Sequence, residues 1–260
     1  MPAQFPRARC LEEESVKVLL LGLICLFAMT TIAADSHPVS HKSGDETVNA
    51  ILYTPQGKGP FPALVVIHEW WGLNDWVKED ASKLADQGYA ALAIDLYRGK
   101  VATTPDEAHE IMRGVPQDRA TRDLLAATSY LRAQKNVDPK RVGSIGWCMG
   151  GGYSLDLALN DPKLKAAVIN YGHLATDEAS LKKINAAILG IFGGQDRGIP
   201  VADVNKFESQ LKALGKTVEI RIFPDAGHGF ENPNNKQGYR ADDAAQAWKL
   251  TVDFLAKNLK

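Results

Sequence analysis

An uninterrupted apolar run from Phe61 to His68 (FPALVVIH) restricts the possible folds of this chain more than any other segment. A strand that is apolar at every position is buried on both faces, and such strands belong to parallel sheets covered by helices. Strand-like and helix-like segments alternate after it, which is typical of an α/β fold with a mostly parallel central sheet and helices on both faces. We therefore expect a single domain of the α/β class.

The remaining elements continue this alternation. The predicted strands are an edge strand at Thr47 to Tyr53, then Ala90 to Ile94, Arg141 to Ile145, Ala166 to Asn170, Ala187 to Phe192 and Thr217 to Phe223. The predicted helices are Asp75 to Gln87, Arg119 to Gln134, Met149 to Leu159, Val201 to Leu214 and Asp242 to Leu259. Two longer loops, Tyr97 to Asp118 and Tyr171 to Leu181, are expected at the carboxyl ends of the strands, where open α/β sheets bind ligands.

The N-terminal segment does not fit this pattern. Val18 to Met29 (VLLLGLICLFAM) is apolar and is followed by small and polar residues. Its length is typical of a secretory signal and falls short of the about 20 residues that span a bilayer. We expect a leader over residues 1–34, cleaved after Ala33 or Ala34, and one exported domain over residues 35–260. That domain is expected in the periplasm or outside the cell, without stable membrane insertion.

Three acidic residues, Glu12 to Glu14, precede the apolar run, where a signal should carry positive charge. Translation from Val16 would remove them and leave Lys17 as a short basic region. Two alternatives stay open: an uncleaved N-terminal anchor helix and a lipoprotein attached at Cys25. The bulky Ile24 before that cysteine disfavours the second.

Charge and cysteine content narrow the functional classes. The net charge is −1 with both signs spread along the chain, so no basic surface suggests nucleic acid and a small molecule is the expected partner. Cys10 and Cys25 lie in the predicted leader, which leaves Cys148 as the only cysteine of the domain. A lone cysteine closes no intramolecular disulfide, so packing, intermolecular pairing or reactivity must explain it.

Cys148 lies in the segment Gly146-Trp147-Cys148-Met149-Gly150, directly between a predicted strand and a predicted helix. This is the G-x-S-x-G nucleophile elbow with cysteine in place of serine. Glycines are needed there because the turn is tight and side chains would collide with neighbouring elements. A helix N-terminus also favours a thiolate. The alternative is a small apolar cysteine in a glycine-rich turn.

An acid and a histidine follow in the order that this fold requires. Asp196 comes after one predicted strand (FGGQDRGIP) and His228 after the next (FPDAGHGF). We expect His228 to take the thiol proton and later protonate the leaving group, while Asp196 orients its imidazole. The backbone N–H groups of Met149 and Trp70 are the candidate oxyanion donors.

The motifs HEWWGLN, DLYRG, GWCMGG, GGQD and AGHGF together resemble the dienelactone hydrolase family over nearly the whole predicted domain. The resemblance implies that Cys148, Asp196 and His228 form a catalytic triad. It also implies that Glu69 is catalytic and helps to generate the thiolate when substrate enters. The expected reaction is hydrolysis of a small ester or lactone through a covalent thioester.

The chain departs from the family at the positions that grip a substrate carboxylate. The resemblance implies two arginines, one after the DLY motif and one four residues beyond the histidine, but the second position here is Asn232, preceded by Glu231. Arg98 and Arg113 are the nearest candidates for the first. We therefore expect uncharged substrates to be preferred.

The remaining expectations concern the pocket and its alternatives. Candidate substrate-contacting residues are Trp71, Tyr97, Arg98 and Tyr171. His68 and His173 have no spacing that suggests a metal site, so we expect neither metal nor cofactor. A cysteine peptidase or amidase, and a non-catalytic binding protein on the same scaffold, remain alternatives. An intact triad disfavours the binding protein, and the sequence indicates no long substrate groove for a peptidase.

Overall fold

The computed structural model describes residue 1 and residues 34–260 of the 260-residue chain, so the predicted leader lies almost entirely outside the described residues. Its centre is one eight-stranded sheet in the order β1-β2-β4-β3-β5-β6-β7-β8. The strands are β1 (Asp35–Ser43), β2 (Glu46–Thr54), β3 (Phe61–Ile67), β4 (Ala90–Ile94), β5 (Val137–Trp147), β6 (Ala166–Asn170), β7 (Ala187–Gly193) and β8 (Val218–Phe223). From β4 to β8 every neighbouring pair is parallel, whereas β1 and β2 are antiparallel to their neighbours.

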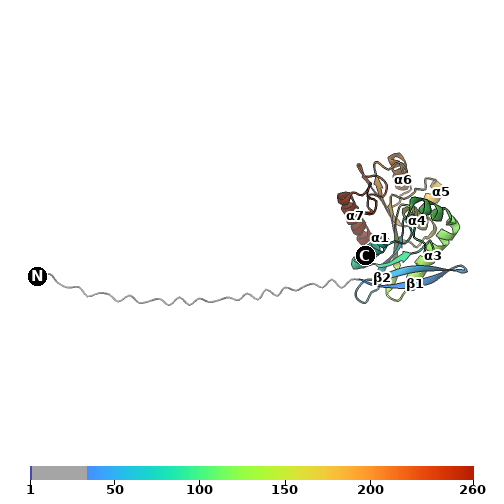
Figure 1. Cartoon of the computed structure of the whole chain (residues 1–260), viewed down its shortest axis with the longest axis horizontal. Helices are drawn as coiled ribbons and strands as arrows, with labels where there is room; N and C mark the ends of the chain where they lie inside the picture. Colours follow the sequence, from blue (N-terminus) through green and yellow to red (C-terminus); the bar gives the residue numbers. More distant parts are fainter. Residues whose placement is uncertain (2–33) are drawn as a thin grey trace. The chain divides into compact units, whose positions relative to one another are not determined.

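Helices cover both faces of the sheet. They are α1 (Asp75–Asp86), α2 (Pro105–Arg113), α3 (Gln117–Arg132), α4 (Met149–Asn160), α5 (Glu178–Leu181), α6 (Val201–Ala213) and α7 (Ala241–Leu259). Figure 1 shows α1 and α7 on one side of the sheet and α3 and α4 on the other. Strands β4, β6 and β7 are buried at every position, as expected for strands covered on both faces. The predicted α/β class is confirmed.

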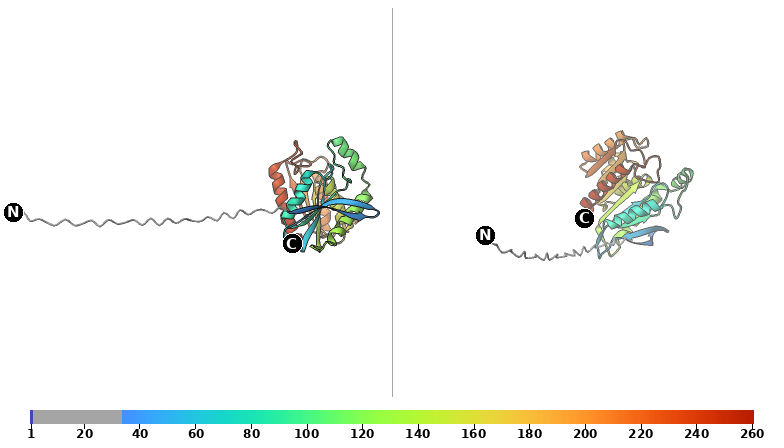
Figure 2. Two further views of the ribbon diagram at one scale, coloured as in Figure 1. Left: turned by 60° about the horizontal axis from the view of Figure 1, so that its bottom comes forward. Right: turned by 60° about the vertical axis from the view of Figure 1, so that its left-hand side comes forward.

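Three elements were missed from the sequence: β1, α2 and the four-residue helix α5, which lies in the predicted loop Tyr171 to Leu181. The β1–β2 hairpin lies at one edge of the sheet, opposite β8 (Figure 2), and β1 was missed because its sequence DSHPVSHKS is polar and mostly exposed. Helix α2 lies inside the segment that we expected to be a loop. Its N-terminus carries a capping box between Thr104 and Glu107 with Pro105 at the first helical position, a signal that the sequence already contained.

Candidate active site

Cys148 occupies the turn between β5 and α4, with φ 55° and ψ −118°. Backbone with positive φ is strained for a residue with a side chain and is held here by its surroundings. The backbone N–H of Cys148 donates to the Asn170 carbonyl oxygen at 3.0 Å. A Cβ at Gly146 would meet the Gly150 carbonyl oxygen, and a Cβ at Gly150 would meet the Ile67 carbonyl oxygen. The glycines of the motif are thus required by close backbone packing around the cysteine.

His228 and Asp196 meet beside this turn, from the loops after β8 and β7. Nδ1 of His228 and Oδ2 of Asp196 are 2.7 Å apart, and Oδ1 of Asp196 accepts from the N–H groups of Gly198 and Ile199 at 2.8 and 3.2 Å. Burial opposes ionisation of Asp196, but the His228 contact and these N–H donors hold the pKa of its carboxyl below the usual value. An ionised Asp196 fixes Nδ1 of the imidazole as a donor and leaves Nε2 free for chemistry.

Cys148 is the second partner of His228. Burial lowers the pKa of the imidazole, but its hydrogen bond with Asp196 and its interaction with Cys148 outweigh burial and raise that pKa to about 10. The His228 side chain is still 43% exposed, so it faces the cavity as well as its partners. Cys148 is thus electrostatically coupled to the hydrogen-bonded pair of His228 and Asp196.

Glu69 is buried in the loop after β3, with 3% of its surface exposed. Asn232, on the His228 loop, donates from Nδ2 to Oε2 of Glu69 at 2.6 Å. Burial raises the pKa of Glu69 to about 7, although the hydrogen bond from Asn232 acts in the opposite direction. Glu69 can therefore gain or lose a proton near neutral pH, which a solvated glutamate does not do.

His68 fixes the backbone from which Glu69 projects. The Leu96 N–H donates to Nε2 of His68 at 3.3 Å, so Nδ1 carries the proton and donates to the Glu69 carbonyl oxygen at 2.6 Å. Within residues 34–260, no group of three histidine, cysteine, aspartate or glutamate side chains is arranged to hold a metal ion. His68 is thus a structural residue of this loop.

The N–H groups of Met149 and Trp70 have no hydrogen-bond partner in the described part of the chain. Met149 is the first residue of α4, whose first-turn N–H groups have no acceptor within the helix. Both residues line the same cavity as Cys148. Two unpaired backbone donors that belong to residues lining the cavity with the thiol are suited to donate hydrogen bonds to a developing oxyanion.

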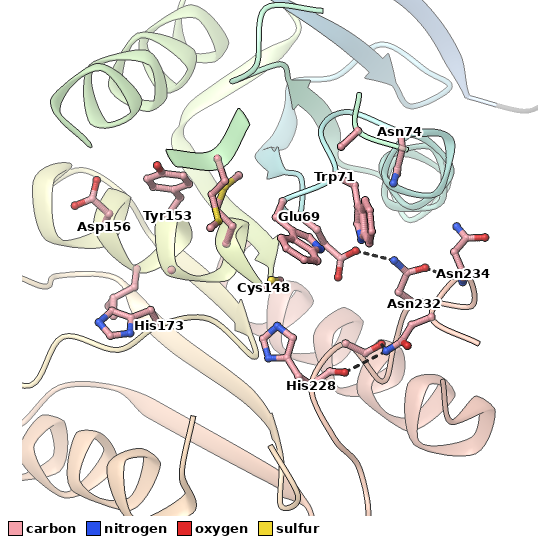
Figure 3. A pocket seen from close by; sticks show the side chains of 18 of the residues that line it. Glu69, Trp71, Asn74, Cys148, Tyr153, Asp156, His173, His228, Asn232 and Asn234 are labelled. Atoms are coloured by element: carbon pink, nitrogen blue, oxygen red, sulfur yellow. Dashed lines mark hydrogen bonds between the residues drawn. The ribbon is translucent and has the colours of Figure 1, made fainter. Parts of the chain in front are cut away.

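A cavity of about 1290 Å³ opens over Cys148 and His228. Figure 3 shows Tyr153, Asp156 and His173 on one side of Cys148, and Glu69, Trp71, Asn74, Asn232 and Asn234 on the other. Lys236 is the only lysine or arginine among its lining residues in the described chain. Apart from the imidazole of His228, the cavity therefore offers little positive charge to an anionic ligand.

The four predicted substrate contacts have different outcomes. Trp71 lines the cavity. Tyr97 does not, and its hydroxyl donates to Sδ of Met149 at 3.2 Å. Tyr171 is fully buried and packs its ring against His228, with the ring centroids 5.2 Å apart. Both tyrosines are buried and contact site residues, Tyr97 contacting Met149 and Tyr171 contacting His228, but neither lines the cavity. The expectation that they form the pocket wall was wrong.

Arg98 is also placed away from the cavity. Its guanidinium lies 2.7 Å from Oδ2 of Asp123 and 2.7 Å from Oε2 of Glu46. Arg113 donates from Nε to the His109 carbonyl oxygen at the end of α2 and does not line the cavity either. The expectation that Arg98 contacts substrate is therefore corrected: two carboxylates already neutralise it.

Several lining residues were not found from the sequence. They are Asn74, Met112, Gln117, Tyr153, Leu155, Asp156, Leu159, Ala175, Asn234 and Asn235. Helical spacing places Tyr153, Asp156 and Leu159 on one face of α4, but only the fold shows that this face meets the cavity. Met112 was missed together with α2.

The sheet order, the cysteine elbow and the acid and histidine on later strand ends define an α/β-hydrolase. The family model described as "Dienelactone hydrolase family" matches residues 48–259. This chain belongs to the dienelactone hydrolase family.

Three similar proteins illustrate the relationship. A Methylorubrum extorquens protein, provisionally named a carboxymethylenebutenolidase, is 33% identical over 87% of this chain and 84% of its own length. A Klebsiella pneumoniae crystal structure, provisionally described as a dienelactone hydrolase, is 28% identical with a TM-score of 0.78, covering 86% of this chain and 99% of that one. The structure of P91 from metagenomic libraries, described as a dienelactone hydrolase-like promiscuous phosphotriesterase, is 26% identical with a TM-score of 0.81 and covers 88% and 100%.

Proposed function

We propose that this hydrolase cleaves uncharged carboxylic esters or lactones, with Cys148 as the nucleophile. The observation that carries the proposal is the hydrogen-bonded pair of His228 and Asp196, which lines one cavity with Cys148 and with the residues of two unpaired backbone N–H groups. An acyl-transfer site needs a nucleophile, a base, an orienting acid and oxyanion donors, and these residues supply one candidate for each.

The reaction proceeds in two halves. Nε2 of His228 takes the Cys148 proton while Sγ attacks the carbonyl carbon, and the N–H groups of Met149 and Trp70 stabilise the resulting oxyanion. The carbon–oxygen bond to the leaving group then breaks, and His228 returns the proton to the departing oxygen. A thioester on Cys148 remains. Water attacks this thioester with His228 as base, and the acid product and free thiol are released.

Glu69 is a further proton acceptor in this proposal. Its pKa of about 7 lets it hold either protonation state at neutral pH, and it lines the cavity with Cys148. A carboxylate that ionises near the operating pH is suited to proton transfer. Transfer of the single thiol proton to Glu69 in place of His228 is therefore a second route in the proposal, and Glu69 then returns that proton to the site before the leaving group departs.

The first experiment measures p-nitrophenol release from p-nitrophenyl acetate by purified protein, with Cys148→Ala as the matched control. Rapid acid quench followed by mass spectrometry should show one acetyl group on the wild type and none on the variant. Turnover that survives Cys148→Ala would refute the cysteine mechanism. Absence of any ester turnover would instead favour the binding-protein alternative.

Two further assays separate the remaining alternatives. p-Nitroacetanilide, the amide counterpart of the ester, should be turned over poorly, because an amine leaving group needs more assistance than p-nitrophenolate. Faster cleavage of the amide would favour an amidase. Iodoacetamide should add one more group to folded wild type than to Cys148→Ala, and activity should be lost in parallel.

A further inference from the structure

The face of α4 that continues beyond the nucleophile forms one wall of the cavity. Met149, Gly152, Tyr153, Asp156 and Leu159 all line it and recur at the spacing of a single helical face. Because an α-helix rises 1.5 Å per residue, this wall runs for ~15 Å from Met149 to Leu159. The proposed chemistry uses only its first residue.

The surroundings of this wall are mostly apolar, with Asp156 on the wall itself and His173 on the same side of Cys148 (Figure 3). Met112 reaches it from α2 and Ala175 from the loop after β6, and Leu155 contributes from α4 itself. We call Met112, Tyr153, Leu155, Leu159 and Ala175 the apolar arm. In Figure 3 Tyr153 and the Asn74–Asn232–Asn234 group lie on opposite sides of Cys148, so the arm leads away from the asparagine side.

The size of the cavity exceeds what a small lactone needs. Ordinary small-molecule sites have volumes of roughly 300–1,000 Å³, and this one has about 1290 Å³. An apolar surface that stays open to water gains free energy when an apolar group covers it. The space beside Cys148 therefore favours a substrate with an apolar extension.

We propose that the apolar arm binds an uncharged hydrocarbon chain on one half of the ester, and that the natural substrate is a medium-chain ester. This proposal rests on the function proposed above. Asp156 lies on the wall of the arm, where it accepts hydrogen bonds from Thr121 at 2.6 Å and Asn160 at 3.1 Å. A carboxylate at the end of the chain would face Asp156 without a lysine or arginine in the arm. The chain is thus expected to end in an apolar group.

The test compares kcat/KM for p-nitrophenyl esters from acetate to decanoate, and for ethyl to octyl acetates. In one of the two series, kcat/KM should rise about three- to fourfold per added methylene, the fold-change that corresponds to burying one CH₂. It should then level off when the arm is full. The series that rises shows whether the arm holds the acyl or the alkoxy half.

Leu159→Trp places a large ring at the far end of the arm and should lower the octanoate-to-butyrate ratio of kcat/KM at least tenfold. Asn205→Trp, on the exposed side of α6, is the matched control and should leave this ratio within about twofold. If Leu159→Trp fails to fold by circular dichroism, Met112→Trp narrows the same arm from the opposite side.

The outcomes separate the two proposals. If no ester is turned over, the proposed function fails. If acetate is turned over by the Cys148 mechanism but neither series rises with chain length, the function stands and the apolar-arm proposal is overturned. An unchanged ratio in folded Leu159→Trp or Met112→Trp would also overturn it.

Discussion

Asn232 holds the buried carboxylate of Glu69 through a 2.6 Å hydrogen bond between two different loops of the site. The partner is an uncharged amide, so Glu69 has a hydrogen bond without a counter-charge there. Burial consequently dominates and raises the pKa of Glu69 from 4.5 to about 7. This pair links the loop of the histidine to the loop that carries one of the candidate oxyanion donors.

Glu69 should make the protein less stable as the pH rises. Between pH 4.5 and about 7 the folded state keeps a proton on Glu69 that the unfolded chain has released, so the free energy of unfolding falls across this window. Glu69→Gln removes this cost. The variant should match the wild type at pH 4 and exceed it by about 3 kcal/mol at pH 8, by the 1.36 kcal/mol per pKa unit of the linkage relation. Urea denaturation at both pH values measures this, and Glu79→Gln, on an exposed part of α1, is the control. A variant no more stable at pH 8 would contradict the assigned pKa.

Cys148 and His228 should behave as one unit. Cys148→Ala and His228→Ala should each reduce kcat by roughly 10⁴ or more, and the double variant should lose little beyond either one. The physical reason is that His228 acts by accepting the Cys148 proton, so removal of either residue stops the same step. Steady-state kinetics with p-nitrophenyl acetate provides the comparison, and His37→Ala, on an exposed part of β1, is the histidine control. Losses that multiply would show that the two residues act independently.

Uncharged substrates should be preferred over the carboxylate-bearing dienelactone. Arg98 is paired with Asp123 and Glu46, and Asn232 offers an amide at the position where the resemblance implies an arginine. A substrate carboxylate would therefore lack charge-assisted hydrogen bonds worth roughly 1.5–3 kcal/mol each. We expect a higher kcat/KM for a neutral ester or lactone. A tenfold preference for the anionic lactone would refute this expectation.

The same argument predicts a weak salt dependence. Salt screens interactions between exposed charges, and a neutral substrate presents none. The rate with a neutral ester should change less than twofold between 20 and about 200 mM salt. Lys236→Gln, which removes the only lysine or arginine that lines the cavity in the described chain, should leave this behaviour unchanged.

Export predicts a new N-terminus at Ala34 or Asp35. β1 begins at Asp35, so removal of residues 1–34 would leave the whole described sheet intact. Within residues 34–260, no helix is long and apolar enough to cross a membrane. Intact-mass measurement of protein from the periplasm or medium of the producing cell tests the cleavage. Soluble protein that retains residues 1–34 in the cytoplasm would overturn it.

Sequence reasoning located the core strands and the strand-to-helix turn that carries Cys148, because buried parallel strands and the cysteine elbow have strong local patterns. The acid and histidine followed from chain order, since each lies directly after a predicted strand. The wall of the cavity could not be found in this way. Arg98 had the right residue type near the right strand, but its ion pair with Asp123 depends on the packing of α3 against the sheet. Met112 and Ala175 line the same cavity as Leu159 only because the fold brings distant segments together. Their spacing in the sequence gives no sign of this.

Helix α4 has Cys148, the proposed nucleophile, as its N-cap residue and Leu159, at the end of the apolar arm, about three turns later. In the two proposals, the reaction takes place at the start of α4 and the length of the substrate chain is selected farther along the same helix, by different residues. A mutation near Leu159 can change which ester is accepted while the strained turn at Cys148 stays as it is. If the apolar arm selects the substrate as proposed, changes at the far end of α4 would alter chain-length preference in this protein and leave the turn at its start unchanged.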